Sequence, residues 1–294
     1  MLSRLRRECR WTTTEFVPQK SSGDAATLRW DSDAPNRLTV GDTTFNVADL
    51  FPARNDQRMV VRKPPDMIEV VAAVINEVKP RNIIELGIAQ GGSTALLAQL
   101  AQPAKLVAIE KELAAVAALE SYISSHDLES VVKPYYGVDQ ADTVALDRIV
   151  ASEFGDEPLD LVIDDASHLL NETRISFNRL FPHVREGGVY MIEDWAWGHY
   201  SADTIPPELV DNWSASWPTG APLTVLAFEL LMTCAAPDRI IQELKVDREF
   251  VQIRRGPATL DRSTFDISHS FIEGPVKLLA PRIFTSSRLR TRFS

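Results

Sequence analysis

Acidic residues and one histidine follow two apolar segments in the second half of the chain. The segment VIDDASH contains Asp164, Asp165 and His168, and the segment MIEDW contains Glu193 and Asp194. Both apolar runs are typical of buried strands. Acids buried at strand ends cost free energy unless another group compensates their charge. Four carboxylates and a histidine at two strand ends therefore require a shared partner or a shared chemical task.

A glycine-rich segment, ELGIAQGGST, lies earlier in the chain. Glu85 ends an expected strand, and Gly87 and Gly91 lead into a helix that begins near Ser93. Glycines let the backbone approach a ligand closely, and helix N-terminal amides favour an anionic group. Glu110 ends the next expected strand, where an acid can accept both hydroxyls of a ribose. These features fit NAD or S-adenosylmethionine, although the glycine spacing differs from the G-x-G-x-x-G of NAD sites. A tight turn without a ligand is the structural alternative.

Five expected strands alternate with helices and set the positions of these residues. This alternation is typical of an α/β domain with a doubly wound, mainly parallel sheet. Ligands of such sheets bind beyond the carboxyl ends of the strands. The expected strands are 82–87, 105–110, one within 131–139, 159–165 and 187–194, and the expected helices are 64–79, 91–102, 113–126, 141–154 and 171–181.

A further pair of strands is expected after an apolar helix over 221–236. The segment DRIIQELKVDREFVQIRRG reads as two strands joined by a tight turn near Asp247 and Arg248. Strands joined in this way are antiparallel. A dehydrogenase-type domain would more often continue with parallel strand–helix units, so the closing hairpin counts against that class.

Residues 1–63 have a different pattern. Polar and apolar residues alternate around Asn36 and Gly41, which predicts short antiparallel strands outside the main sheet. We expect an N-terminal extension that packs on the domain or on a second subunit of a homo-oligomer. The expected organisation is an extension over 1–63, the main domain over 64–258 and a tail over 259–294.

Charge and composition exclude several classes of protein. The net charge is −10, but residues 1–10 carry +3 and residues 282–294 carry +4, so the rest carries −17. So acidic a body is a poor footprint for nucleic acid. We expect the basic ends to be solvated tails, with an anionic membrane surface or an acidic partner as the alternative. No apolar run is long enough for a membrane span, no secretory signal is visible, and the two cysteines form no metal pattern, so we expect a cytoplasmic protein.

The successive segments IIELGIAQGGST, LVAIE, YYGVDQAD, LDLVIDDASH and REGGVYMIED resemble the motifs of class I S-adenosylmethionine-dependent methyltransferases in their order. The resemblance covers residues 65–255. Five parallel strands closed by an antiparallel hairpin is also the strand order for which this superfamily is known. Within it, the chain is most similar to metal-dependent sugar O-methyltransferases of the mycinamicin type, and it also resembles the cephalosporin-hydroxylase-like group.

The resemblance implies roles for the residues at the two strand ends. In mycinamicin-type enzymes an Asp-x-x-His follows strand four and a Glu-Asp follows strand five, which here are Asp165, His168, Glu193 and Asp194. The three acids would hold Mg²⁺ or another divalent cation, and His168 would be the catalytic base. Chemistry agrees, because a hard cation relieves repulsion between carboxylates and prefers oxygen ligands. A helix cap or salt bridge is the structural alternative for each single acid.

The resemblance also implies a cofactor site for S-adenosylmethionine. Its expected residues are Glu85, Gly87, Gly91, Ser93, Glu110, Asp139 and Asp164. Glu85 would face the ammonium group of the ligand, and Asp139 follows strand three, where the superfamily contacts adenine. Asp164 is either a structural acid or a contact of the methionine end.

An aromatic segment after the fifth strand is the expected acceptor pocket. It contains Trp195, Trp197, Tyr200, Trp213 and Trp217, and aromatic faces stack on sugar rings. The resemblance therefore implies a small-molecule or glycan acceptor, such as a glycosylated natural product or a glycolipid. The alternatives are another enzyme on the same scaffold, such as an NAD-dependent oxidoreductase or a hydroxylase-like protein, and a non-catalytic interaction protein.

Overall fold

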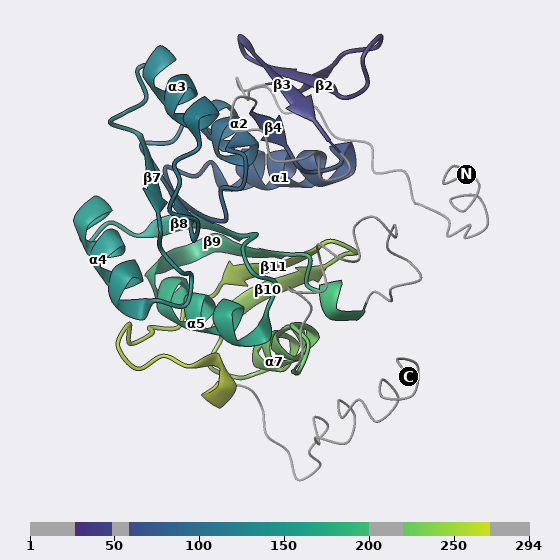
Figure 1. The fold of residues 1–294 in the computed structure, drawn as a ribbon. Coiled ribbons are helices and arrows are strands. Elements are labelled where there is room, and N and C mark those ends of the chain that lie inside the picture. Colours follow the sequence, from purple (N-terminus) through teal and green to yellow (C-terminus); the bar gives the residue numbers. More distant parts are fainter. Residues whose placement is uncertain (1–26, 49–58, 200–219, 271–294) are drawn as a thin grey trace, which may run out of the picture.

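The computed structural model describes residues 27–48, 59–199 and 220–270, and Figure 1 shows their arrangement. A seven-stranded sheet forms the middle layer, with helices on both faces. The sheet order is β10-β11-β9-β8-β5-β6-β7. The strands are β5 (Asn82–Leu86), β6 (Lys105–Glu110), β7 (Val132–Tyr136), β8 (Leu159–Asp164), β9 (Val184–Glu193), β10 (Ile241–Val246) and β11 (Phe250–Arg255).

The five strands from β5 to β9 are parallel, and β11 pairs antiparallel with both β9 and β10. The prediction of a doubly wound sheet closed by an antiparallel hairpin is confirmed. The hairpin turn lies near Asp247 and Arg248, as predicted. Asp247 Oδ1 stabilises it by accepting hydrogen bonds from the backbone N–H groups of Glu249 and Phe250. Such side-chain-to-backbone bonds are the usual reason for an aspartate at a turn.

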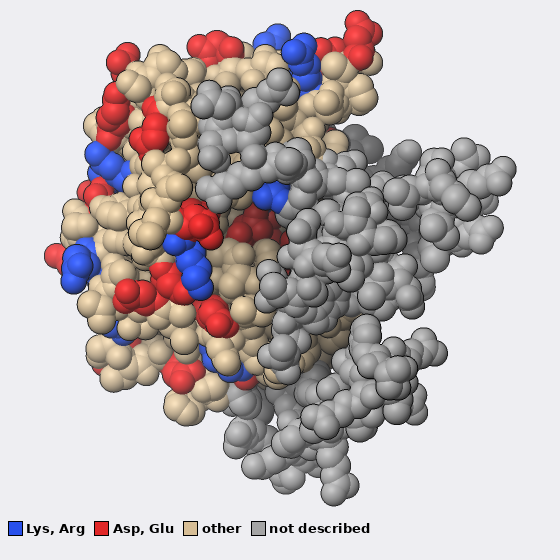
Figure 2. Space-filling view, in the orientation of Figure 1, with Lys and Arg blue, Asp and Glu red and all other residues tan. Residues whose placement is uncertain are grey.

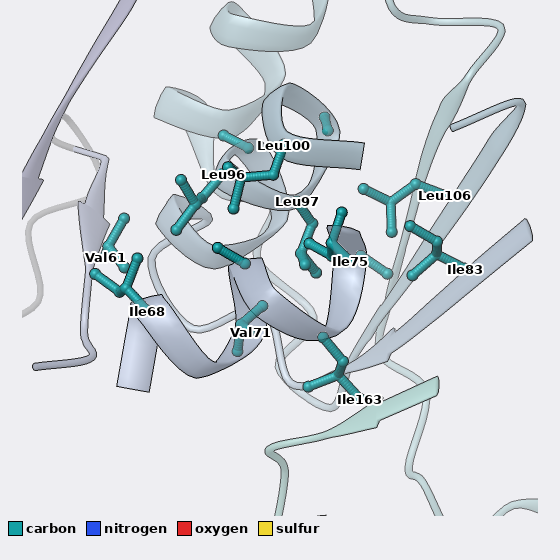
Figure 3. Close-up of a cluster of buried hydrophobic side chains, with 14 of the residues drawn as sticks. Val61, Ile68, Val71, Ile75, Ile83, Leu96, Leu97, Leu100, Leu106 and Ile163 are labelled. Carbon is teal, nitrogen blue, oxygen red and sulfur yellow. The ribbon is translucent and has the colours of Figure 1, made fainter. Parts of the chain in front are cut away.

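Two hydrophobic clusters cover the two faces of the sheet. The first packs β5, β6 and β8 against the helices α1 (Pro65–Val78), α2 (Gly92–Ala101) and α3 (Ala117–Ser125), and Figure 3 shows its centre. The second packs the opposite face against α4 (Thr143–Glu153), α5 (Leu170–Leu180) and α7 (Thr224–Cys234). No helix among the residues that the structure describes has the length and apolarity needed to cross a bilayer.

Helix boundaries follow from local sequence. Pro65 takes the first position of α1, where its missing N–H is not needed, and Lys79 ends the helix in the left-handed region just before Pro80. Asp142 caps α4 by accepting from two backbone N–H groups. The helix expected over 171–181 ends at Leu180, and a 3₁₀ turn over Phe181–His183 follows it.

A second, four-stranded sheet precedes α1. It consists of β1 (Arg29–Trp30), β2 (Arg37–Val40), β3 (Thr43–Val47) and β4 (Val60–Val61), in that order. The first three strands are antiparallel, as the alternating pattern predicts, whereas β4 joins β3 in parallel.

The small sheet packs on the main domain. Its buried residues Leu38, Phe45 and Val61 belong to the same cluster as α1 and α2, and Figure 3 draws Val61 beside Ile68 of α1. Of the two packing surfaces expected for the extension, the structure shows the one on the domain. The expected division at residue 63 stays a prediction.

Candidate functional site

The carboxyl ends of β8 and β9 bring the acidic residues together. The two strands are adjacent and parallel, so Asp165 leaves the sheet beside Glu193 and Asp194. The backbone N–H of Asp165 donates to Leu86 O over 2.9 Å, and that of Asp194 donates to Glu249 O over 2.9 Å. Each acid is therefore attached through its backbone to the neighbouring strand end, which fixes where its side chain begins.

A lysine lies between two of these acids. The Nζ atom of Lys63 is 2.6 Å from Asp165 Oδ2 and 2.6 Å from Glu193 Oε2. Lys63 is 5% exposed and Glu193 is 1% exposed. The lysine comes from the segment between β4 and α1, far from both acids in the sequence. The strand-end acids therefore have a basic partner that the sequence reasoning did not include.

Burial and charge act in opposite directions in this cluster. Burial lowers the pKa of Lys63, but the charges of Asp165 and Glu193 outweigh it and hold that pKa above its usual value. Burial and the charge of Asp165 raise the pKa of Glu193 well above its ordinary range, although Lys63 opposes this shift. A raised pKa favours a charged Lys63 but a neutral Glu193, so the two pKa shifts favour different charge states for the contact between these residues. We take the pair as ionised, because two 2.6 Å contacts are typical of charge-assisted hydrogen bonds.

His168 stands on the other side of the acids. Its Nε2 atom is 3.7 Å from Asp165 Oδ1 and 3.8 Å from Asp194 Oδ2, too long for hydrogen bonds. The side chain is 21% exposed, and its ring centroid lies 6.5 Å from that of Trp197. The ring is thus close to the acids, and neither of these contacts holds Nε2 in a hydrogen bond.

Two of these residues have an unusual backbone. His168 has a φ of 55° and Asp194 has a φ of 50°, both in the left-handed region. A non-glycine residue there costs about 1–3 kcal/mol and is tolerated where the surroundings impose it, often at functional sites. The turns after β8 and β9 therefore aim these side chains at a cost in stability.

The donor set suits a hard cation. Ligand atoms of Asp165, His168 and Asp194 lie within 4.8 Å of one another. Glu193 is not a member of this cluster, but its Oε1 atom is buried and has no hydrogen-bond partner among the residues that the structure describes. A buried carboxylate oxygen without a partner is costly, and oxygen-rich clusters are the kind of site that Mg²⁺ prefers. Figure 2 shows acidic side chains gathered in and around a hollow on this face of the molecule.

The glycine-rich turn between β5 and α2 lies at the same edge of the sheet. Glu85 is 1% exposed and accepts hydrogen bonds from the hydroxyls of Thr94, over 2.5 Å, and Ser93. Burial raises the pKa of Glu85 to about 7. Gly91 adopts a φ of 78° at the start of α2, so the helix is not capped by the Ser93 or Thr94 hydroxyl. Those hydroxyls serve Glu85 instead.

Glu110 holds the glycine-rich turn from the end of β6. Its Oε2 atom accepts from the backbone N–H groups of Ile88, over 3.1 Å, and Ala89, over 2.9 Å. Its Oε1 atom accepts from the backbone N–H of Glu112 over 3.0 Å, so the carboxylate is held beside the turn. The ribose contact of Glu110 stays a prediction. Asp139 lies after β7, where it pairs with Lys111 over 2.8 Å, and this contact lowers its pKa.

The Asp164 side chain is buried and hydrogen-bonded within the protein. It is 2% exposed, and its carboxylate accepts hydrogen bonds from Gln140, Ser176 and Tyr190. The geometry therefore favours the structural alternative for Asp164 over a contact with a ligand. Gln140 extends this network, because its Oε1 atom accepts from the backbone N–H of Ser167 over 2.8 Å.

Gly87 joins the glycine-rich turn to the acidic cluster. It adopts a φ of 94°, and a Cβ atom added there would lie 2.2 Å from the backbone oxygen of Asp165. Only glycine permits so close an approach. The two turns are therefore packed backbone to backbone, and neither can move independently of the other.

The aromatic segment is only partly described. Trp195 Nε1 donates to Asp247 O over 3.0 Å, which ties that indole to the hairpin turn. Trp197 belongs to a 3₁₀ turn over Trp197–His199 next to His168. Tyr200, Trp213 and Trp217 lie outside the described residues.

Comparison with known proteins agrees with this geometry. Residues 84–195 match the model of a family described as a methyltransferase domain. This stretch runs from β5 to the end of β9 and includes the glycine-rich turn and all the strand-end acids. Residues 84–195 therefore form a methyltransferase domain. The resemblance stated from the sequence is confirmed.

Curated relatives of this domain are O-methyltransferases. The chain is 46% identical over 87 residues to mycinamicin VI 2''-O-methyltransferase of Micromonospora griseorubida, which is 29% of this chain and 21% of that protein. It is 44% identical over 85 residues to demethylmacrocin O-methyltransferase of Streptomyces fradiae, or 28% of this chain and 20% of that protein. The similarity thus spans about a fifth of the length of these relatives.

Among solved structures, the chain resembles the MycE methyltransferase from the mycinamycin pathway in complex with Mg, SAH and mycinamycin VI. The identity is 25%, the TM-score is 0.46, and the overlap covers 67% of this chain and 50% of that one. The O-methyltransferase TomG of Streptomyces achromogenes, in complex with SAM, gives 19% identity and a TM-score of 0.47, covering 66% of this chain and 81% of that one.

The sequence-based predictions do not include Lys63 in the site or Gln140 in the network that supports it. Lys63 lies in the segment expected to belong to the extension, and Gln140 has no distinctive sequence context. A signal for Lys63 existed, because buried carboxylates require positive charge and Lys63 directly precedes the first helix of the methyltransferase domain. No comparable signal pointed to Gln140, whose role depends on a contact between two loops.

Proposed function

We propose that the protein is an S-adenosylmethionine- and Mg²⁺-dependent O-methyltransferase that methylates a hydroxyl of a sugar, carried by a natural product or a glycolipid. The observation that carries the proposal is the meeting of Asp165, His168 and Asp194 at one sheet edge, packed against the glycine-rich turn. The sugar class is supported by relatives named for glycosylated substrates, such as L-olivosyl-oleandolide 3-O-methyltransferase and 8-demethyl-8-alpha-L-rhamnosyl tetracenomycin-C 2'-O-methyltransferase.

The cofactor residues in this proposal are those of the glycine-rich turn and of the strand end beside it. Gly87, Gly91, Ser93 and Glu85 line the methionine side, and Glu110 accepts the ribose hydroxyls. Glu110 is already held beside the turn by two backbone N–H groups, so little reorganisation is needed. Asp139 is placed at the adenine side, and Asp164 is left out because its carboxylate is bonded within the protein.

The metal residues are Asp165, Glu193 and Asp194. When bound, a divalent cation would lower the pKa of an acceptor hydroxyl. His168 lies beside the acids with Nε2 outside hydrogen-bonding distance of both neighbouring carboxylates, so in its neutral form it can accept that proton. Trp197, whose ring lies near His168, and Trp195, which follows Asp194 in the chain, are proposed to contact the acceptor.

A direct test uses methyl-labelled S-adenosylmethionine and a panel of glycosylated small molecules with free sugar hydroxyls. We expect label transfer in the presence of MgCl₂, loss of transfer in excess EDTA, and recovery when MgCl₂ is restored. S-adenosylhomocysteine should still bind in EDTA, because its residues differ from the metal residues. Full transfer in EDTA would eliminate the metal role, and stabilisation by NAD instead of S-adenosylhomocysteine would eliminate the methyltransferase proposal.

His168→Ala tests the base. Turnover should fall by roughly 10²–10⁴, the usual contribution of a general base, while binding of S-adenosylhomocysteine is unchanged. His269→Ala, at an exposed histidine in a 3₁₀ turn (Ile267–His269), is the matched control and should keep native turnover. Native turnover in His168→Ala would place the base elsewhere.

A further inference from the structure

We propose that Lys63 is a positioning residue of the metal site, holding Asp165 and Glu193 each by one oxygen so that their other oxygens face the cation. The inference rests on the proposed function, since it concerns the metal site described there. It makes the segment between the small N-terminal sheet and α1 a part of the catalytic apparatus.

Lys63 contacts only one oxygen of each of the two carboxylates. Lys63 contacts Asp165 Oδ2 and Glu193 Oε2 over 2.6 Å each. Asp165 Oδ1 is directed toward His168, in the cluster whose ligand atoms lie within 4.8 Å of one another. Glu193 Oε1 is buried without a partner among the described residues. The lysine therefore occupies one oxygen of each carboxylate and leaves the second available for a metal ion.

The charge of Lys63 also complements that of a divalent cation at this site. Asp165, Glu193 and Asp194 bring three negative charges, and Lys63 brings one positive charge. For these four side chains in their ionised forms, a divalent cation supplies the remaining two charges and the sum is zero. Neutrality matters here because Glu193 and Lys63 are almost completely buried, and an unbalanced buried charge is costly. Lysine and divalent cation thus complement each other's charge in the same cluster.

Lys63 lies in a segment whose backbone is held on both sides. It follows β4, which packs so closely on α2 that a Cβ atom added to Gly92 would lie 2.2 Å from the carbonyl carbon of Val60. After Lys63, Pro64 and Pro65 restrict the backbone before α1 begins. The ammonium group is therefore delivered by a fixed segment. Groups that fix metal ligands in this way typically change metal affinity 10–100-fold when they are removed.

A competing role for Lys63 makes the opposite prediction. If the ammonium group merely filled the metal position, its removal would free the acids and tighten metal binding. The positioning role predicts weaker binding, because the two carboxylates lose the group that orients them. The sign of the change in metal affinity separates the two roles.

The test measures Mn²⁺ affinity by calorimetry or electron paramagnetic resonance, and S-adenosylhomocysteine affinity in parallel, for the native protein and for Lys63→Met. We expect a 10–100-fold loss of Mn²⁺ affinity with S-adenosylhomocysteine affinity within about twofold. Lys105→Met is the matched control, because Lys105 pairs with Glu153 over 2.9 Å away from the site. It should leave both affinities unchanged. Mn²⁺ affinity that is unchanged or tighter in Lys63→Met would overturn the proposal.

Two further measurements cover the case in which Lys63→Met does not fold. Lys63→Gln keeps an N–H donor and should fall between the native protein and the methionine variant in Mn²⁺ affinity. In native protein labelled with ¹⁵N-lysine, the buried ammonium group should stay protected from hydrogen exchange when MgCl₂ is added, whereas displacement by Mg²⁺ would overturn the proposal. A native protein that binds S-adenosylhomocysteine but no Mn²⁺ would instead contradict the metal part of the proposed function.

Discussion

The backbone of Gly87 packs closely on that of Asp165. A larger residue at position 87 therefore tests how tightly the glycine-rich turn and the proposed metal site are coupled. Gly87→Ala introduces a Cβ atom 2.2 Å from Asp165 O and 2.9 Å from Asp165 C. Real Cβ contacts stay beyond 3.0 Å, so the two backbones must separate by at least about 0.8 Å. A misplacement of about 1 Å at a reacting centre can cost about 10² in rate. We therefore expect a loss of that order in turnover and a clear loss of Mn²⁺ affinity.

Gly155→Ala is the matched control for Gly87→Ala. Gly155 has a φ of 58° but would place its Cβ atom with nothing within 4 Å. Both variants incur the cost of a side chain at positive φ, about 1–2 kcal/mol of folding free energy, and urea unfolding should show it in both. Only Gly87→Ala should lose turnover and metal affinity. If both variants keep native turnover and lose only stability, the glycine-rich turn and the metal site are not coupled.

Glu110→Ala should weaken S-adenosylhomocysteine binding by roughly 1.5–3 kcal/mol, because a charge-assisted contact to the ribose and the support of Ala89 are both lost; calorimetry against Glu112→Ala, an exposed acid nearby, checks it, and equal affinities would remove Glu110 from the site. Glu85→Gln should change the pH dependence of stability. The pKa of Glu85 is about 7 when folded, above its ordinary 4.5, so the native protein loses stability as pH rises through 7, by about 2–3 kcal/mol between pH 5 and 8 relative to the glutamine variant. Urea unfolding at the two pH values measures this, and parallel curves would show that Glu85 is already ionised at pH 5.

Strand order was predictable because its signals are local. The apolar runs that end in Glu85, Glu110 and Glu193 are each continuous in sequence, and parallel strands between helices read in this way. The hairpin was located by alternation around Asp247. Residues that end strands of one parallel sheet share an edge, but the meeting of Asp165 with Glu193 also requires β8 and β9 to be neighbours, which the structure shows and local patterns do not fix.

Contacts between distant segments could not be predicted in the same way. Lys63 is 102 positions from Asp165, and nothing in its own surroundings indicates which acids it contacts. Asp164 and Asp165 are adjacent in sequence and look alike, yet the pleat of β8 sends the first into the network with Ser176 and Tyr190 and leaves the second at the site. The side on which each of two consecutive acids lies depends on where the strand ends, and that boundary is the least certain part of a sequence-based prediction.

The antiparallel strand β11 has a consequence for any shortened form of the protein. Residues 84–195 carry the family match, but β9 is covered on its outer side by β11, which lies beyond that range. A fragment trimmed to the match would present the almost fully buried β9 as an open edge, a template for aggregation. It would also expose the apolar faces that α1, α7 and the small sheet cover. The stretch that matches the family model is therefore shorter than the stretch that folds, and a shortened form of the protein should keep the whole folded stretch.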